Sequence, residues 1–173
     1  MVADAMSQCL VVMARAPVAG RVKTRLIPYL GRQRAARVYH HLLVDTVRRL
    51  GQSSAYSMKL SCTPDTRHPL FHCLARDNRL SLLRQPAGDL GQRMLRIFSH
   101  ELVQHASVII VGTDLVNLDA GLVERAFADL QQGADVVLAR TLDGGYGLIG
   151  MNRLYGQLFR GIPWSTSRVA DVT

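Results

Sequence analysis

Apolar residues along this chain gather in short runs that alternate with longer amphipathic segments. The run Val108–Val111 has no polar interruption, which is typical of a strand buried on both faces of a sheet. Other short apolar segments, bounded by glycine, proline or polar residues, indicate further strands. The pattern predicts strands at Gln8–Ala14, Tyr56–Cys62, Leu80–Arg84, Ser107–Gly112, Asp135–Arg140 and Tyr146–Met151, with Asp135–Arg140 also buried.

The amphipathic segments predict helices between these strands. The longest is expected at Arg32–Leu50, where apolar residues recur every three to four positions and Gly51 follows as a stop. Its expected buried face is Ala35, Val38, Leu42, Thr46 and Leu50. Shorter helices are expected at Leu70–Ala75, Leu90–Gln104 and Gly121–Gln131, with Asp89 and Asp119 as caps of the last two.

Strands that alternate with helices predict an α/β fold. We expect a three-layer α/β/α sandwich with a mostly parallel sheet and right-handed crossovers, formed as one domain over residues 1–173. The apolar runs Leu10–Met13, Val108–Val111 and Val136–Leu138 are expected to be adjacent or near-adjacent buried parallel strands. Ligands of such sheets bind beyond the carboxyl ends of the strands. This rule selects three loops, Arg15–Arg25, Thr113–Asp119 and Thr141–Gly145.

Charge and cysteine content narrow the partners and the compartment. The 173 residues carry a formal net charge of +8, which favours anionic partners. An aromatic content of 6% without basic-aromatic interleaving makes single-stranded nucleic acid an unexpected ligand. No apolar run approaches the ~20 residues of a membrane span. The odd number of cysteines lacks metal or disulfide spacing, and the N-terminus lacks a basic signal region, so we expect a cytoplasmic protein.

The first selected loop is basic. Arg15, Arg21, Lys23 and Arg25 are candidates to bind phosphate oxygens, since lysine supplies a point charge and arginine a planar fork. Two further candidates there are Gly20, which permits close backbone approach, and Pro17, which stiffens the loop. The spacing is not that of a Walker A loop. A solvated basic loop without a ligand is the alternative interpretation.

The other two loops carry acids. Asp114 follows a buried strand and is a candidate ligand for a divalent cation, with a turn or capping aspartate as the alternative. Asp143, Gly144 and Gly145 form either a second metal or ribose contact or simply a tight turn. Cations on one side and carboxylates on the other are what a site for a nucleotide diphosphate and its metal requires.

Several segments together resemble a bacterial family of uncharacterised proteins related to nucleotide-diphospho-sugar transferases, with a glycosyltransferase-A-like fold. The matching segments are Ala16–Leu26, Gly88–Met94, Gly112–Asp114, Asp143–Tyr146 with Leu148–Gly150, and Ile162–Thr166. The family is close to phospholactate guanylyltransferases and molybdenum-cofactor nucleotidyltransferases. The resemblance implies a nucleotide at the first strand and loop, with Lys23 and Arg25 at its phosphates. It also implies Mg²⁺ or Mn²⁺ near Asp114, and places Asp143 in the second acidic loop.

Two departures from the family pattern affect these expectations. Leu115 and Val116 stand where the family usually has Cys-Pro, so the loop around the expected metal should differ in geometry. The sequence ends at Thr173, before a helix and strand found in other members, so we expect that helix and strand to be lacking and a sheet edge to favour homo-oligomers.

The predicted function is a metal-dependent transferase that uses a nucleotide sugar or a nucleoside triphosphate. Lys23 and Asp114 are its expected catalytic residues, because they would stabilise charge on the phosphates and hold the metal. The alternative is a non-catalytic protein that binds nucleotide or nucleic acid on the same scaffold. The residues do not identify the base, the sugar or the acceptor.

Overall fold

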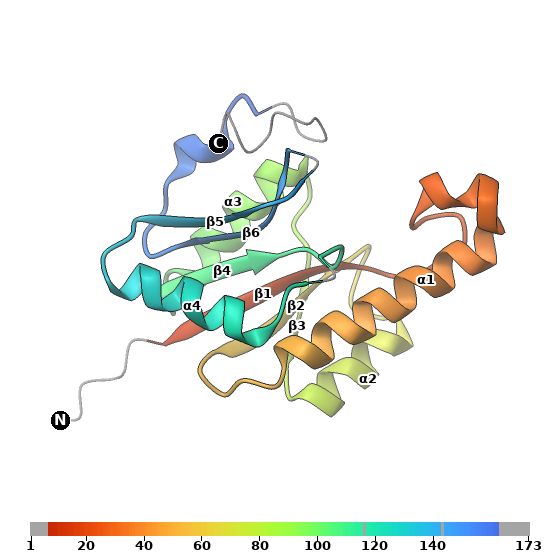
Figure 1. Cartoon of the computed structure of the whole chain (residues 1–173), viewed down its shortest axis with the longest axis horizontal. Helices are drawn as coiled ribbons and strands as arrows, with labels where there is room; N and C mark the ends of the chain where they lie inside the picture. The colour runs from red at the N-terminus through yellow and green to blue at the C-terminus, as the bar shows by residue number, and fades with distance from the viewer. Residues whose placement is uncertain (1–6, 116, 143, 163–173) are drawn as a thin grey trace.

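A six-stranded sheet in the order β3-β2-β1-β4-β6-β5 forms the centre of the protein (Figure 1). The structure, a computed structural model, describes residues 7–115, 117–142 and 144–162. The strands are β1 (Gln8–Arg15), β2 (Ser57–Thr63), β3 (Ser81–Arg84), β4 (Ser107–Val111), β5 (Val136–Arg140) and β6 (Tyr146–Met151). All the strands predicted from the apolar runs are present, with their ends moved by one residue at most.

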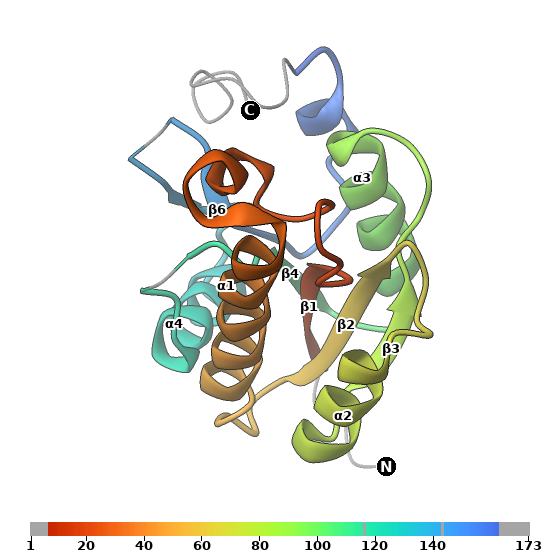
Figure 2. The ribbon, with the colours of Figure 1, turned by 90° about the vertical axis from the view of Figure 1, so that its right-hand side faces the viewer.

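Helices cover both faces of the sheet. They are α1 (Ile27–Leu50), α2 (Pro69–Asn78), α3 (Leu90–Glu101) and α4 (Ala120–Gln131), with short 3-10 turns η1 (Thr24–Leu26) and η2 (Gly156–Phe159). In Figure 1, α1, α2 and α4 lie in front of the sheet and α3 lies behind it; Figure 2 shows the same layers from the side. Two separate apolar cores correspond to these faces, because Leu10 and Val12 pack towards α1 while Cys9 and Val11 pack towards α3. The predicted three-layer α/β/α architecture is confirmed.

The sheet is parallel except at β6. β1 pairs in parallel with both β2 and β4, whereas β6 lies between β4 and β5 and is antiparallel to both. Consequently β5 runs in the same direction as β4 but forms the edge of the sheet. The prediction that Asp135–Arg140 is a buried strand is therefore wrong: its residues are half-buried or exposed, and the Leu138 side chain is 37% exposed. An apolar run does not by itself distinguish a central strand from an edge strand.

Helix α1 differs from its prediction in one informative way. Gly31, at φ 75°, separates a first turn from the regular helix that follows, which agrees with the predicted start at Arg32. Its buried face, however, includes Tyr39 and Leu43, whereas the predicted Val38 and Leu42 are only half-buried. Ala35, Thr46 and Leu50 are buried as predicted, so the buried face is wider than expected and includes Tyr39.

The predicted helix caps are confirmed. Asp89 forms a capping box with Gln92 at the start of α3, and the Asp119 carboxylate accepts a hydrogen bond from the Leu122 amide at the start of α4. Cys9 and Cys62 are fully buried, free thiols. Within the described residues, no helix is long and apolar enough to cross a membrane.

Gly150 on β6 provides a test of this packing. A Cβ atom there would lie 2.7 Å from Ile109 Cγ1 and 2.8 Å from Val137 Cγ2. We expect Gly150→Val to lower the free energy of unfolding by about 1–3 kcal/mol, because overpacking outweighs the strand propensity of valine. Gly112→Ala is the control, since nothing lies within 4 Å of that position. Equal urea midpoints for Gly150→Val and the wild type would contradict the packing described.

Candidate functional site

The loops that follow β1 and β4 lie next to each other at the carboxyl ends of these strands and enclose a cleft. The cleft has a volume of about 1060 Å³. Residues from several parts of the chain far apart in sequence line it, among them Arg15, Arg21, Lys23, Asp114, Arg140 and Gly145. Parallel pairing of β1 with β4 brings their carboxyl ends together, which is why the basic and the acidic loop become neighbours. Asp114 is the only carboxylate among the described residues of this lining.

An ion pair joins the basic loop to the acidic one. Lys23 Nζ lies 3.0 Å from Asp114 Oδ1, and their side chains are 23% and 69% exposed. Such an exposed pair contributes little to stability. The ion pair matters for the arrangement of the site, because it holds a cation and a carboxylate side by side at the cleft. We expected Lys23 and Arg25 to face the same cleft as Asp114; this holds for Lys23, whereas Arg25 is not among the residues that line the cleft.

The backbone of the basic loop is arranged to present Lys23. Lys23 has φ 46° and ψ 43°, a left-handed conformation that costs a non-glycine residue on the order of 1 kcal/mol. Its carbonyl accepts a hydrogen bond from the Leu26 amide at 2.9 Å. Gly20, at φ 82°, supplies the other left-handed turn of the loop without that cost. Strain of this kind in a non-glycine residue is common at functional sites.

Tyr39 of α1 connects the two loops through hydrogen bonds to its side chain. Its buried hydroxyl accepts hydrogen bonds from the Arg15 amide at 2.9 Å and from the Thr113 hydroxyl at 3.3 Å. Burial raises the pKa of Tyr39, and the nearby Asp114 raises it further. The side chain is therefore a neutral phenol at neutral pH. Sequence reasoning missed this residue, although its spacing from Ala35 and Leu43 fits the buried face of the helix.

A second residue of α1 holds the acidic loop. The Arg49 guanidinium donates hydrogen bonds to the Leu118 carbonyl at 2.5 Å and to the Leu115 carbonyl at 3.4 Å. The Leu115 side chain packs directly onto Gly147 of β6, where a Cβ atom would lie 1.9 Å from its Cδ1 atom. The leucine that replaces the family's usual cysteine thus contacts β6, at a glycine that leaves room for it.

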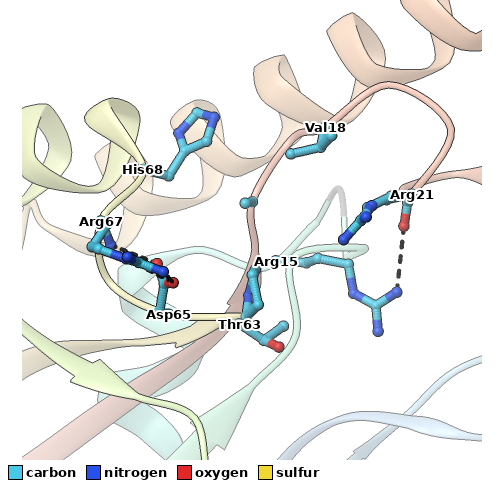
Figure 3. A pocket seen from close by; sticks show the side chains of 9 residues that line it. Arg15, Val18, Arg21, Thr63, Asp65, Arg67 and His68 are labelled. Carbon is cyan, nitrogen blue, oxygen red and sulfur yellow. Dashed lines mark hydrogen bonds and ion pairs between the residues drawn. The ribbon is translucent and has the colours of Figure 1, made fainter.

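A smaller pocket of about 490 Å³ opens beside the cleft (Figure 3). It shares Arg15, Arg21 and Thr63 with the cleft, and its remaining lining includes residues that follow β2. There Asp65 pairs with Arg67 at 2.6 Å, and hydrogen bonds from Arg67 lower the pKa of Asp65. Because that pair is neutral, Arg15 and Arg21 supply the remaining formal charge among the described residues of the pocket lining. The signal in the sequence was the end of β2, to which the strand-end rule applies equally.

The structure brings some predicted residues together and not others. Arg15, Arg21, Lys23, Asp114 and Gly145 all line the cleft. The remaining described candidates lie outside its lining: Pro17, Gly20, Arg25 and Gly144. Arg25 is exposed on η1, so its role in phosphate binding remains a prediction. Asp143 lies outside the described residues, as do the residues of Ile162–Thr166 after Ile162.

With this geometry established, comparisons with known proteins assign the family. Residues 46–166 match the family described as "Uncharacterized protein conserved in bacteria (DUF2064)". The chain belongs to this family. The match includes β4, the acidic loop and β6, and begins within α1, after the basic loop. Comparison with curated protein sequences found no match.

Solved structures agree with this assignment at the level of fold. A protein from Desulfovibrio desulfuricans G20, provisionally named a nucleotide-diphospho-sugar transferase, has a TM-score of 0.85 and 27% identity, over 96% of this chain and 74% of its own. A cytidylyltransferase from Leptospira borgpetersenii has a TM-score of 0.57 and 14% identity, over 89% of this chain and 62% of its own. Glucosyl-3-phosphoglycerate synthase from Mycobacterium tuberculosis was solved with Mn²⁺, uridine diphosphate and glucosyl-3-phosphoglycerate. It has a TM-score of 0.52 and 11% identity, over 97% of this chain and 64% of its own. The family and the nucleotide-diphospho-sugar transferase fold expected from the sequence are confirmed.

The Tyr39 hydroxyl provides a test of the site. Tyr39→Phe leaves the Arg15 amide without its partner and should lower the free energy of unfolding by about 1–3 kcal/mol. It should also weaken ligand binding in the cleft, because the two loops lose their shared anchor. Tyr56→Phe is the matched control, since the Tyr56 hydroxyl donates to the Leu50 carbonyl at 2.6 Å, away from the cleft. Denaturation and calorimetry on both variants make the comparison; equal loss of binding would contradict a specific role for Tyr39.

Proposed function

We propose that this protein is a metal-dependent transferase that acts on a nucleotide sugar or a nucleoside triphosphate in the cleft. The observation that carries the proposal is the Lys23–Asp114 pair, 3.0 Å apart at the carboxyl edge of the sheet. It provides one cationic and one anionic group at a single position, as a phosphate and its metal require. The fold of the family supports a transferase of this general kind.

The residues present fit Mg²⁺ or Mn²⁺. Asp114 is largely exposed and offers a carboxylate oxygen, the ligand type that a hard cation prefers. Such ions are commonly held by one or two carboxylates together with substrate phosphates and water. Asp143 is proposed as the second carboxylate. When bound, the metal would screen the charge of the diphosphate and stabilise the leaving group.

The cationic side chains of the cleft would bind the phosphates. Lys23 supplies a point charge beside Asp114, while Arg15 and Arg21 supply guanidinium groups where the cleft joins the smaller pocket. Because the cleft and the pocket share these residues, we infer that one extended ligand occupies both. Its diphosphate would lie near Lys23 and one end would lie in the smaller pocket. Arg25 is kept as a further phosphate contact, and Pro17, Gly20 and Gly144 would then shape the surrounding loops.

The described lining favours nucleotidyl transfer. An inverting glycosyl transfer needs a general base, and Asp114, the one carboxylate described in the cleft, is assigned to the metal. Transfer at phosphorus relies mainly on positioning and electrostatic stabilisation, which the cationic residues supply. A non-catalytic nucleotide-binding protein is the second candidate. Turnover of a nucleoside triphosphate or nucleotide sugar with Mg²⁺ or Mn²⁺ would exclude that candidate.

Binding of nucleotides and nucleotide sugars, with and without metal, tests the role of Lys23. Lys23→Ala should weaken binding by about 1.5–3 kcal/mol, because a charge-assisted hydrogen bond is lost. Arg34→Ala is the control, since it removes a cation from the exposed part of α1. Calorimetry with the nucleotide that gives the largest thermal shift makes the measurement. Unchanged affinity for Lys23→Ala would remove Lys23 from the site.

The role of Asp114 has its own test. Asp114→Asn should abolish the metal dependence of nucleotide binding, because the amide keeps the shape but lacks the charge that a hard cation prefers. Asp119→Asn is the control, since asparagine caps a helix as well as aspartate does. Magnesium titration with nucleotide present should separate the two variants. Equal metal affinity in the wild type and Asp114→Asn would show that Asp114 is not a ligand.

A further inference from the structure

A buried polar cluster lies at the end of the sheet opposite the cleft. It combines Cys9 near the start of β1, Lys59 of β2, Glu101 at the end of α3, and His105 in the turn before β4. Cys9 is fully buried, and the Glu101 side chain is 1% exposed. Nothing in the proposed transfer chemistry uses these groups. Burial of a carboxylate is costly unless a cation and hydrogen bonds compensate it, and Glu101 has Lys59 at 2.6 Å and His100 at 3.1 Å as partners.

Three of these side chains direct potential metal-ligand atoms towards one another. Cys9 Sγ lies 3.9 Å from Glu101 Oε2, and His105 Nε2 lies 3.6 Å from the same oxygen. All three atoms lie within 4.8 Å of one another. In a tetrahedral zinc site the bond lengths place ligand atoms about 3.3–3.6 Å apart, so adjustments of about 1 Å would complete the geometry.

The histidine presents a ring nitrogen whose contact with the Glu101 oxygen, at 3.6 Å, is too long for a hydrogen bond. His105 Nδ1 forms a hydrogen bond with Ser7 Oγ at 2.9 Å, which fixes the orientation of the ring. Its Nε2 atom is buried and has no hydrogen-bond partner among the described residues. A metal-binding histidine typically has this arrangement, in which one ring nitrogen is held by an outer partner and the other faces the ion.

The Lys59 ammonium balances the negative charge of the Glu101 carboxylate in this structure. Its Nζ atom lies 2.6 Å from Glu101 Oε2, the oxygen that Cys9 and His105 also approach. We propose that this cluster is a second metal site, which binds Zn²⁺ or a similar transition-metal ion through Cys9 Sγ, Glu101 Oε2 and His105 Nε2 and displaces the Lys59 ammonium. A thiol, an imidazole and a carboxylate select such ions over Mg²⁺. Water would complete the coordination.

The charges balance in this exchange. Burial raises the pKa of Cys9 to about 11, so the residue is a thiol when no metal is bound. On binding, the S–H proton leaves to solvent and the sulfur–metal bond forms. The thiolate and the Glu101 carboxylate then neutralise the two charges of the ion. Lys59, whose side chain is 16% exposed, moves its ammonium into solvent.

The site is separate from the transfer chemistry. Arg15 follows Cys9 by six positions along β1, which corresponds to about 20 Å of extended strand. The ion therefore cannot contact a phosphate in the cleft. Its role would be to fasten the end of α3 to the starts of β1 and β4, and the inference stands or fails independently of the proposed function.

Titration of tag-free, metal-stripped protein with Co²⁺ tests the proposal. We expect one equivalent to bind and to produce a thiolate-to-cobalt charge-transfer band together with the visible bands of a tetrahedral ion. Cys9→Ser and His105→Gln should each abolish the band. Cys62→Ser and Cys73→Ser are the controls and should retain it, since neither thiol belongs to the cluster. Absence of the band, or its persistence in Cys9→Ser, would overturn the proposal.

Lys59→Met sharpens the test because it gives an effect in the opposite direction. Removal of the competing ammonium should tighten Co²⁺ and Zn²⁺ binding about tenfold or more, since like charges at close range repel. It should also enlarge the increase in Tm that Zn²⁺ produces. A purely structural ion pair predicts no metal binding in either protein. Equal or weaker metal affinity in Lys59→Met would contradict displacement of Lys59.

Discussion

The parallel pairing of β1 with β4 is the constraint on which the functional architecture depends. Residues 9–12 of β1 lie opposite residues 108–111 of β4, and all of them are at most 2% exposed. Backbone hydrogen bonds buried on both faces leave little freedom to shift register. The basic loop and the acidic loop therefore leave the sheet side by side. Lys23 and Asp114 are 91 positions apart in the sequence, and this pairing is what brings them into contact.

Helix α1 converts that proximity into a defined geometry. The Tyr39 hydroxyl accepts hydrogen bonds from residues at the start of both loops, and the Arg49 guanidinium donates hydrogen bonds to carbonyls of the acidic loop. The strained backbone of Lys23 persists because the surrounding loop is fixed in this way. The helix thus stabilises the site from within the core, while the residues that would contact a ligand lie on the loops above it.

The two lysines of the chain occupy corresponding positions at opposite ends of the sheet. Lys23 pairs with Asp114 at the carboxyl end, and Lys59 pairs with Glu101 at the amino end. Each places a compact ammonium against a carboxylate for which we propose a divalent ion. An ammonium is a point charge that a metal can replace, whereas a guanidinium binds as a planar fork. Arginines supply most of the remaining positive charge, which accords with their proposed role as phosphate contacts.

The succession of strands and helices along the chain, the caps at Asp89 and Asp119, and the basic loop could be predicted from the sequence, as could the shared cleft of Lys23 and Asp114. These follow from local periodicity, from capping chemistry and from the rule that parallel strands end together. By contrast, the insertion of β6 between β4 and β5, the inward side chain of Tyr39 and the convergence of Glu101, His105 and Cys9 became apparent only in the folded protein. Those features depend on which strands pair and which helix face is buried, and both are set by packing between residues distant in the chain. Local patterns do not encode such contacts, because the same apolar run satisfies a central strand and an edge strand equally well.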